Sequence, residues 1–319
     1  LIGWVIFHLQ VDNMIKRTLY FGNPAYLKTK DEQLVIVLPT EMVNGQPLPE
    51  EIKTVPIEDI GVLIVDHQQI TISQALIAKL LDNNVAFITC DNRHHPTGLL
   101  LNLDGHSLQS AKFQAQIEAT IPLKKQLWQQ TVSCKINNQA GLLENIRVPA
   151  KNMRNWANEV KSGDGDNHEA VAAAYYWKNI FPDFLDFKRD REGAPPNNLL
   201  NYGYAILRAV VARSIVASGM LPTLGIFHKN QYNAYCLADD IMEPYRPFVD
   251  KVVVNIVNLN GKFLELTPSM KKDLLNIPAM DVIINNEKSP LMVAVQKTTA
   301  SLSKCFEGSQ RKILYPSID

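Results

Sequence analysis

The chain has 319 residues, of which 46% are hydrophobic and 20% charged, a composition typical of folded globular proteins and not of disordered chains. Its formal net charge is zero, which excludes a protein that attracts nucleic acid through a basic field over its whole surface. Its four cysteines stand singly with no C-x-x-C pair, so a structural zinc site or a disulfide framework is not indicated and a cytoplasmic location is expected.

The chain opens with an apolar stretch, LIGWVIFHLQVDN, that ends just before the first methionine, Met14. Its apolar run is too short to span a membrane, and a basic region and a cleavage site of the kind found in signal peptides are both missing. We therefore expect no membrane partner. Residues 1–13 are treated as an extension upstream of a natural start at Met14, and they are left out of the fold prediction.

Short apolar segments separated by turn residues predict a β-rich domain over residues 14–105. The segments TLYFG, AYLKTK and QLVIVLP are expected to be antiparallel strands, and IGVLIVD and AFITCD to be further strands. Between these two, ITISQALIAKLLDNNV has helical spacing and begins near Ser73, whose hydroxyl is suited to capping a helix.

After Gly105 the spacing of apolar residues becomes helical and remains so. Two or three helices are predicted within 107–145, with others at 151–161, 168–180, 199–219 and 230–243, and more beyond 246. Gly219 followed by Pro222 is a typical helix end. The pattern therefore predicts a β-rich domain followed by a larger helical one.

The two parts also differ in charge. Residues 1–105 hold 7 basic and 12 acidic side chains, whereas residues 106–319 hold 25 basic and 20 acidic ones. Because phosphates attract basic side chains, any polyanion is expected to meet the helical part. The acidic first part is expected to carry the dimer contacts.

The segment GIFHKNQYNAYCLADDIMEP, residues 225–244, places a histidine ahead of three acids: His228, then Asp239, Asp240 and Glu243. Acids on a helix can serve solubility alone. Alternatively, a histidine and a carboxylate from the two ends of this segment can come together to hold a metal ion. The local pattern leaves both interpretations open.

A second polar segment, SGDGDNHEAVAAAYYW, leads into the helix predicted from residue 168. Asp166 or Asn167 is interpreted as the helix cap, with Glu169 in the first turn near the positive end of the helix dipole. His94 and His95 lie in a Pro/Gly turn and are interpreted as loop residues. The sequence has no Walker loop, GxGxxG, GxSxG or HExxH motif, so nucleotide binding and hydrolysis by a nucleophilic side chain have no support.

Several of these segments together resemble the spacer-acquisition integrases of the CRISPR-associated Cas1 family, in its type II branch. They are TLYFGNPAYL, VPIEDIGVLIVDHQQITIS, VAFITCDNRHHPTGLLL, GDGDNHEAVAAAYYW and the block from Asn198 to Asp250. The resemblance runs from Met14 to at least Val254. It implies an α+β fold, with an N-terminal β-sandwich-like dimerisation domain (residues 14–105) and an all-α catalytic domain (residues 106–319).

The resemblance also implies a metal site. Its ligands are Glu169 in NHEAVAA, His228 in GIFHKNQ and Glu243 in DDIMEP. Two carboxylates and an imidazole suit Mg²⁺ or Mn²⁺ better than metals that prefer thiolates. The roles of Asp239 and Asp240 stay open, and Asp240→Ala is expected to keep metal binding.

The implied activity is that of a DNA endonuclease and integrase of antiviral defence. A 3′-hydroxyl of a prespacer attacks a phosphodiester at a CRISPR repeat, with help from the metal and without ATP. The implied partners are prespacer and repeat duplexes, a second copy of the chain, Cas2 in a heterohexameric complex, other type II adaptation proteins and the effector nuclease. Two alternatives remain: a catalytically silent DNA-binding subunit, and an unrelated helical hydrolase of small phosphoesters.

Basic residues around the implied ligands are candidate contacts to DNA phosphates, with solvated surface charge as the alternative for each. They are Lys151, Arg154, Lys178, Arg208, Arg213, Lys229 and Arg246.

Overall fold

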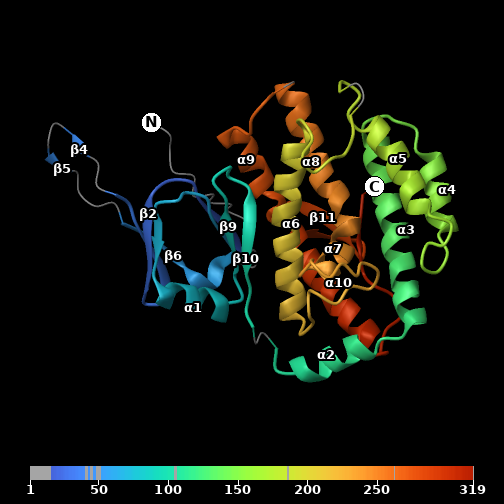
Figure 1. Cartoon of the computed structure of the whole chain (residues 1–319), viewed down its shortest axis with the longest axis horizontal. Coiled ribbons are helices and arrows are strands. Elements are labelled where there is room, and N and C mark those ends of the chain that lie inside the picture. The colour runs from blue at the N-terminus through green and yellow to red at the C-terminus, as the bar shows by residue number, and fades with distance from the viewer. Residues whose placement is uncertain are drawn as a thin grey trace. The chain divides into compact units, whose positions relative to one another are not determined.

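The computed structural model divides into two compact units, residues 1–105 and 106–319, and strands dominate the first while helices dominate the second (Figure 1). The extension of residues 1–13 and Met14 lie outside the described residues. The structure describes residues 16–39, 42–43, 46–47, 52–103, 106–184, 187–261 and 263–318.

Within its described residues, the N-terminal unit forms two four-stranded sheets, ordered β1-β7-β9-β10 and β6-β3-β2-β8. The strands of these sheets are β1 (Arg17–Phe21), β2 (Ala25–Lys30), β3 (Gln33–Val37), β6 (Ile52–Pro56), β7 (Ile60–Val65), β8 (Ile70–Ile72), β9 (Ala86–Cys90) and β10 (Pro96–Leu100). A short hairpin, β4 (Met42–Val43) with β5 (Gln46–Pro47), and the turn η1 (Ile57–Asp59) complete the β structure.

Both sheets are mixed: the antiparallel pairing expected of AYLKTK and QLVIVLP is confirmed for β2 and β3, whereas TLYFG, in β1, pairs in parallel. Strand β7 pairs in parallel with β1 and β9, and β2 pairs in parallel with β8. The pairs β2–β3, β3–β6 and β9–β10 are antiparallel. Alternation of side chains along a strand is the same in both arrangements, so the sequence pattern did not distinguish them.

An apolar core joins the two sheets with helix α1 (Gln74–Asp82). Strand β2 alternates buried and exposed residues, and α1 buries Leu76 and Leu80, which lie one turn apart on the same face. The Ser73 side chain accepts a hydrogen bond from Leu76 N, so the predicted helix cap is confirmed. Burial of each large aliphatic side chain contributes about 1.5–3 kcal/mol to holding the sheets together.

The helical unit packs around α6. Its helices and turns are α2 (Gln109–Glu118), α3 (Ile121–Asn145), α4 (Lys151–Glu159), α5 (His168–Asn179), α6 (Asn197–Ala217), α7 (Cys236–Met242), η2 (Glu243–Tyr245), α8 (Arg246–Asn260), α9 (Pro268–Leu275), η3 (Ile277–Ala279) and α10 (Leu291–Phe306). Helix α6 contacts α7, α8, α9 and α10. It is apolar and long enough to cross a membrane by composition, but 78% of its most apolar window is buried inside the unit, as expected of a central core helix.

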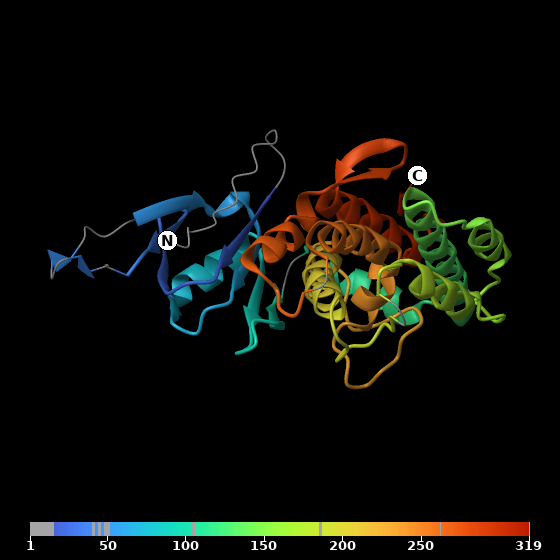
Figure 2. The ribbon, with the colours of Figure 1, turned by 90° about the horizontal axis from the view of Figure 1, so that it is seen from above.

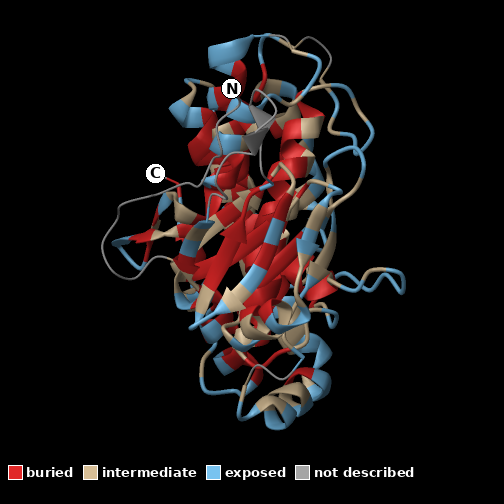
Figure 3. Cartoon of the chain, turned by 90° about the vertical axis from the view of Figure 1, so that its left-hand side faces the viewer, coloured by how far each residue is buried: buried red, intermediate tan, exposed pale blue. Residues whose placement is uncertain are grey.

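Buried residues gather on the strands and the central helices, whereas loops and outer helices carry the exposed ones (Figure 3). Helix α7 begins at Cys236, later than the predicted 230. The preceding residues form turns in which the side chains of Asn230 and Asn233 accept hydrogen bonds from Tyr232 N and Tyr235 N, both at 2.9 Å. Such local bonds compete with helical hydrogen bonding and delay the helix start.

The C-terminal segment adds a small three-stranded sheet to the helical unit. The prediction of an all-α domain did not include this sheet. Its order is β12-β11-β13, from β11 (Asp281–Ile284), β12 (Glu287–Pro290) and β13 (Pro316–Ser317), and the β11–β12 hairpin lies at one edge of the unit (Figure 2). Strands this short give no periodic signal in a sequence. The tail also lies against α3, where a Cβ on Gly141 would come within 2.3 Å of the Ile318 carbonyl oxygen.

Candidate active site

Glu169 lies in the first turn of α5, and an aspartate in the preceding loop fixes the start of that helix. The Asp164 carboxylate accepts hydrogen bonds from His168 N at 2.9 Å and Glu169 N at 3.0 Å. Asn167 occupies the N-cap position, one of the two predicted alternatives, but its side chain makes no cap hydrogen bond, and the Asp164 side chain caps the helix in its place. Because the cap holds the backbone of Glu169 itself, it also fixes where the Glu169 side chain departs.

Glu243 lies in the turn η2 between α7 and α8 and is 6% exposed. Arg246 Nε lies 2.8 Å from its Oε1, and Lys135 Nζ lies 2.6 Å from its Oε2. Burial by itself would raise the pKa of Glu243, but Arg246 and Lys135 outweigh burial and lower the pKa to about 2. The carboxylate is therefore ionised.

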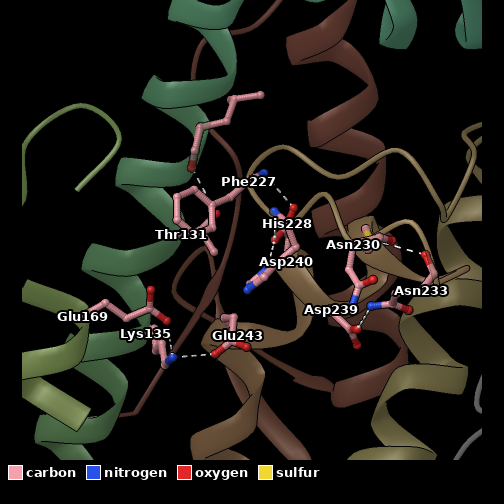
Figure 4. A network of polar contacts seen from close by, with 12 residues as sticks. Thr131, Lys135, Glu169, Phe227, His228, Asn230, Asn233, Asp239, Asp240 and Glu243 are labelled. Carbon is pink, nitrogen blue, oxygen red and sulfur yellow. Dashed lines mark hydrogen bonds and ion pairs between the residues drawn. The ribbon is translucent and has the colours of Figure 1, made fainter. Parts of the chain in front are cut away.

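Lys135, on α3, bridges the two acids (Figure 4). Its Nζ lies 2.6 Å from Oε1 of Glu169 and 2.6 Å from Oε2 of Glu243, and its side chain is 12% exposed. Burial would lower the pKa of Lys135, but Glu243 and Glu169 raise it, so the side chain carries its charge. Glu169 is 34 residues away in the sequence, which explains why no local pattern pointed to Lys135.

His228 is held by Asp240. Its Nδ1 lies 2.5 Å from Oδ1 of Asp240, and the same carboxylate accepts hydrogen bonds from Phe227 N at 2.9 Å and His228 N at 3.3 Å. The hydrogen bond to Asp240 raises the pKa of His228. The Asp240 side chain is fully buried and that of His228 is 45% exposed. Since Nδ1 is engaged, Nε2 is the ring atom available to a ligand.

The loop that carries His228 is tightly packed. Phe227 stacks on Trp128 with ring centroids 4.2 Å apart, and the Trp128 ring meets the His228 ring edge-on at 5.7 Å. A Cβ on Gly225 would lie 2.4 Å from the His228 carbonyl oxygen and 2.8 Å from Oδ2 of Asp240, so the close approach requires glycine. The imidazole is therefore held in one position by both packing and hydrogen bonds.

The third acid of this segment, Asp239, has different partners. Arg208 Nε lies 2.7 Å from its Oδ1. Asn233 Nδ2 donates to its Oδ2 at 2.7 Å (Figure 4). Each of the three acids therefore has its own partners. Asp239 holds the turn before α7, Asp240 holds the His228 loop, and Glu243 pairs with Lys135 and Arg246. The interpretation that these acids serve solubility alone is wrong, because all three are buried.

The three implied metal ligands come from α5, the loop before α7 and η2, and the charges of Glu243 and Glu169 both act on the pKa of His228. Across the described parts of the chain, no three His, Cys, Asp or Glu side chains lie close enough together to hold a metal ion. Glu169 and Glu243 nevertheless converge on one cationic group, the Lys135 ammonium. Two carboxylates and an imidazole are donor types that suit Mg²⁺ or Mn²⁺, so the chemistry of the three residues fits such an ion.

A second buried network lies next to Arg246 and was not predicted. Asp250 accepts hydrogen bonds from the hydroxyls of Tyr176 at 2.6 Å and Tyr204 at 2.5 Å. Burial raises the pKa of Asp250 to about 6, although both hydrogen bonds oppose the rise. The Arg246 guanidinium carbon lies 4.7 Å from the centroid of the Tyr204 ring, so this network supports the arginine that faces Glu243.

The candidate phosphate contacts differ in their exposure. Arg213 is 2% exposed, so its interpretation as a DNA contact is wrong. It lies on the buried side of α6, where burial lowers its pKa to about 10.

Ion pairs hold three of the other candidates: Arg154 to Glu144, Arg208 to Asp239 and Arg246 to Glu243. The exposed candidates are Lys151, Lys178 and Lys229.

Comparison with known proteins adds to this geometry. The family described as "CRISPR associated protein Cas1" matches residues 19–263. The CRISPR-associated endonuclease Cas1 of Neisseria meningitidis serogroup C (strain 8013) is 36% identical over 290 residues, which cover 90% of this chain and 91% of that protein.

Two solved structures are similar in fold. A casposase bound to integration product matches with a TM-score of 0.76 and 18% identity, over 93% of this chain and 92% of that one. A chain of a Cas6-RT-Cas1–Cas2 complex matches with a TM-score of 0.70 and 16% identity, over 94% of this chain and 36% of that one. At these identities the likeness concerns the fold alone.

Proposed function

The chain belongs to the CRISPR-associated Cas1 family, and we propose that it is the metal-dependent DNA integrase and endonuclease that inserts prespacers at a CRISPR repeat. The observation that carries this proposal is the convergence of Glu169 and Glu243 on one cationic group, beside the exposed imidazole of His228. Carboxylate oxygens are the ligands that a hard cation prefers, and the buried Glu243 has a lowered pKa.

In the proposed reaction one phosphodiester replaces another. The 3′-oxygen of the prespacer forms a bond to phosphorus at the repeat, the repeat's own 3′-oxygen leaves, and the proton of the attacking hydroxyl passes to the leaving group through solvent. Glu169, His228 and Glu243 would hold Mg²⁺ or Mn²⁺, which when bound lowers the pKa of the attacking hydroxyl and offsets charge at phosphorus.

The other polar residues of the site have supporting roles in this proposal. Asp240 fixes the tautomer and orientation of the His228 ring, and Arg246 keeps the carboxylate of Glu243 ionised. The exposed residues Lys151, Lys178 and Lys229 are available to DNA phosphates.

We also propose partners for this chain. The names of the two structural neighbours mention an integration product and Cas2, and both support DNA and Cas2 as partners here. A dimer formed through residues 14–105 and membership of the type II branch rest on the sequence resemblance and the charge difference between the two parts of the chain.

A strand-transfer assay tests the proposal. The chain and Cas2 are incubated with a short duplex bearing free 3′-hydroxyls and a repeat-containing duplex, in Mg²⁺, Mn²⁺ or EDTA. We expect joined products only with metal, and none from Glu169→Ala or His228→Ala, both of which should keep the circular dichroism spectrum and unfolding cooperativity of the wild type.

One observation favours a second candidate, the catalytically silent DNA-binding subunit. Lys135 compensates both acids without a metal ion. DNA binding by the wild-type chain with no joined product at any metal concentration would support that candidate and contradict the integrase.

A further inference from the structure

The lysine between the two acids lies where their carboxylates meet. Lys135 Nζ is 2.6 Å from one oxygen of Glu169 and 2.6 Å from one oxygen of Glu243, so these two oxygens are at most about 5 Å apart. A divalent cation that bound the same two oxygens would lie about 2.0–2.2 Å from each. The ammonium and the cation therefore need the same place between the two carboxylates.

We propose that Lys135 is an internal counterion that occupies the centre of the site without metal and leaves it when a divalent cation binds. The proposal rests on the proposed function, since it assumes that Glu169 and Glu243 are metal ligands. Without a cation between them, two close carboxylates would repel each other, one of them 6% exposed. Lys135 thus lies between the two carboxylates and holds them close together before the metal arrives.

The remaining charges of the site favour exchange over joint occupancy. Arg246 contacts the other oxygen of Glu243 and lies over the Tyr204 ring, so it has support on two sides and is expected to stay. With Arg246 in place, the two carboxylates already face one fixed positive charge. Adding a divalent cation while Lys135 stayed would give the site a net charge of +2 from these groups, in a partly buried place. Departure of the flexible ammonium side chain lowers that charge.

The first experiment uses the wild-type chain. Surface lysines are methylated with formaldehyde and a borohydride reagent, with and without saturating Mn²⁺, and the modification of each lysine is followed by mass spectrometry. Because the amine is shielded between two carboxylates, Lys135 should be protected without metal and become modified several times faster with Mn²⁺. Lys124, on the same helix, is the internal control and should not change. Equal protection of Lys135 in both conditions overturns the proposal.

The second experiment removes the competitor. Lys135→Met keeps the length of the side chain and removes its charge, and Lys124→Met is the matched control. If the ammonium fills the site nine-tenths of the time, calorimetric titration with Mn²⁺ should give about tenfold tighter binding for Lys135→Met than for the wild type. Without metal, the variant should also unfold at a lower temperature. Unchanged or weaker Mn²⁺ affinity in a folded Lys135→Met overturns the exchange.

The two experiments separate the exchange from the proposed function. One outcome is that the wild type binds Mn²⁺, Glu243→Gln does not, and Lys135 is equally protected with and without Mn²⁺. The proposed metal site is then supported, and the proposed exchange is contradicted. If neither the wild type nor Lys135→Met binds Mn²⁺, both fail. Tighter binding by Lys135→Met without any change in wild-type labelling is a general charge effect and also contradicts the exchange.

Discussion

Each unit of the protein contains a buried aspartate paired with Nδ1 of a half-exposed histidine. In the N-terminal unit, Asp66 Oδ1 lies 2.9 Å from His94, with side-chain exposures of 1% and 58%. In the helical unit, Asp240 Oδ1 lies 2.5 Å from His228, with exposures of 0% and 45%. Seen in isolation, the two pairs are nearly equivalent.

The two pairs differ in what surrounds them. The second oxygen of Asp66 accepts a hydrogen bond from the Tyr20 hydroxyl, and the pair lies beside a polar cavity of about 310 Å³. In the helical unit, by contrast, the charges of Glu243 and Glu169 act on His228. The two pairs are therefore alike in how the imidazole is oriented, and what distinguishes the helical pair is the presence of two further carboxylates that act on the histidine.

The largest expected effect comes from removing one of those carboxylates. Glu243→Gln keeps the shape of the side chain but removes one of the two carboxylates proposed to bind the cation. Because a bound cation contributes several kcal/mol to stabilising the transition state, strand transfer should fall at least about 100-fold, together with Mn²⁺ binding. Glu144→Gln, in a partly exposed ion pair with Arg154, is the control. Wild-type Mn²⁺ affinity in Glu243→Gln would remove Glu243 from the site.

The next effect tests the aspartate of the helical pair. Asp240→Asn weakens the hold on the imidazole and on two backbone N–H groups, so metal affinity and strand transfer should fall about 10–100-fold. This replaces the expectation that the carboxylate of Asp240 can be lost without effect on metal binding. Asp66→Asn is the matched control and should keep strand transfer. Equal losses in both variants would show that the aspartates act through folding alone.

A smaller effect is expected from the histidine of the N-terminal pair. His94→Ala takes one hydrogen bond from the buried Asp66 carboxylate and should destabilise the N-terminal unit by about 1–3 kcal/mol, with strand transfer unchanged. Urea unfolding followed beside the strand-transfer assay measures both. His67→Ala, in the same cavity, is the control for a lost ring. Loss of strand transfer in a folded His94→Ala would contradict this prediction and show that the N-terminal pair also has a functional role.

The smallest expected effect concerns Asp250, a buried aspartate held by two hydroxyls. Its pKa is raised to about 6 in the folded state, above the ordinary value of 3.8. Between about pH 4 and pH 6 the folded state therefore binds more protons than the unfolded chain, and stability should fall as the pH rises through this window. Asp250→Asn should remove this contribution, which corresponds to a few degrees in melting temperature. Melting curves at pH 4.5, 6 and 7.5 test it, and an identical pH profile in the variant contradicts it.

The sequence by itself determined the features that depend on neighbouring residues. Helical spacing and the Ser73 hydroxyl were enough to place α1, because a helix cap acts over three residues. The change from strand to helix patterns near residue 105 gave the order of the two kinds of structure. The motifs around Glu169, His228 and Glu243 identified the family, because a motif consists of residues that are neighbours in the sequence.

Only the tertiary structure decided how distant residues combine. Lys135 has the sequence context of an ordinary helix residue, and its role follows from acids on two other elements. The sequence around Arg213 does not distinguish it from an arginine on the protein surface, and only the packing around α6 shows that it is buried. Asp239 and Asp240 are adjacent, yet they hold different loops because neighbouring side chains on a helix point about 100° apart. Long-range contacts of this kind leave no periodic or local signal, so the sequence could supply Glu169 and Glu243 but not the lysine between them.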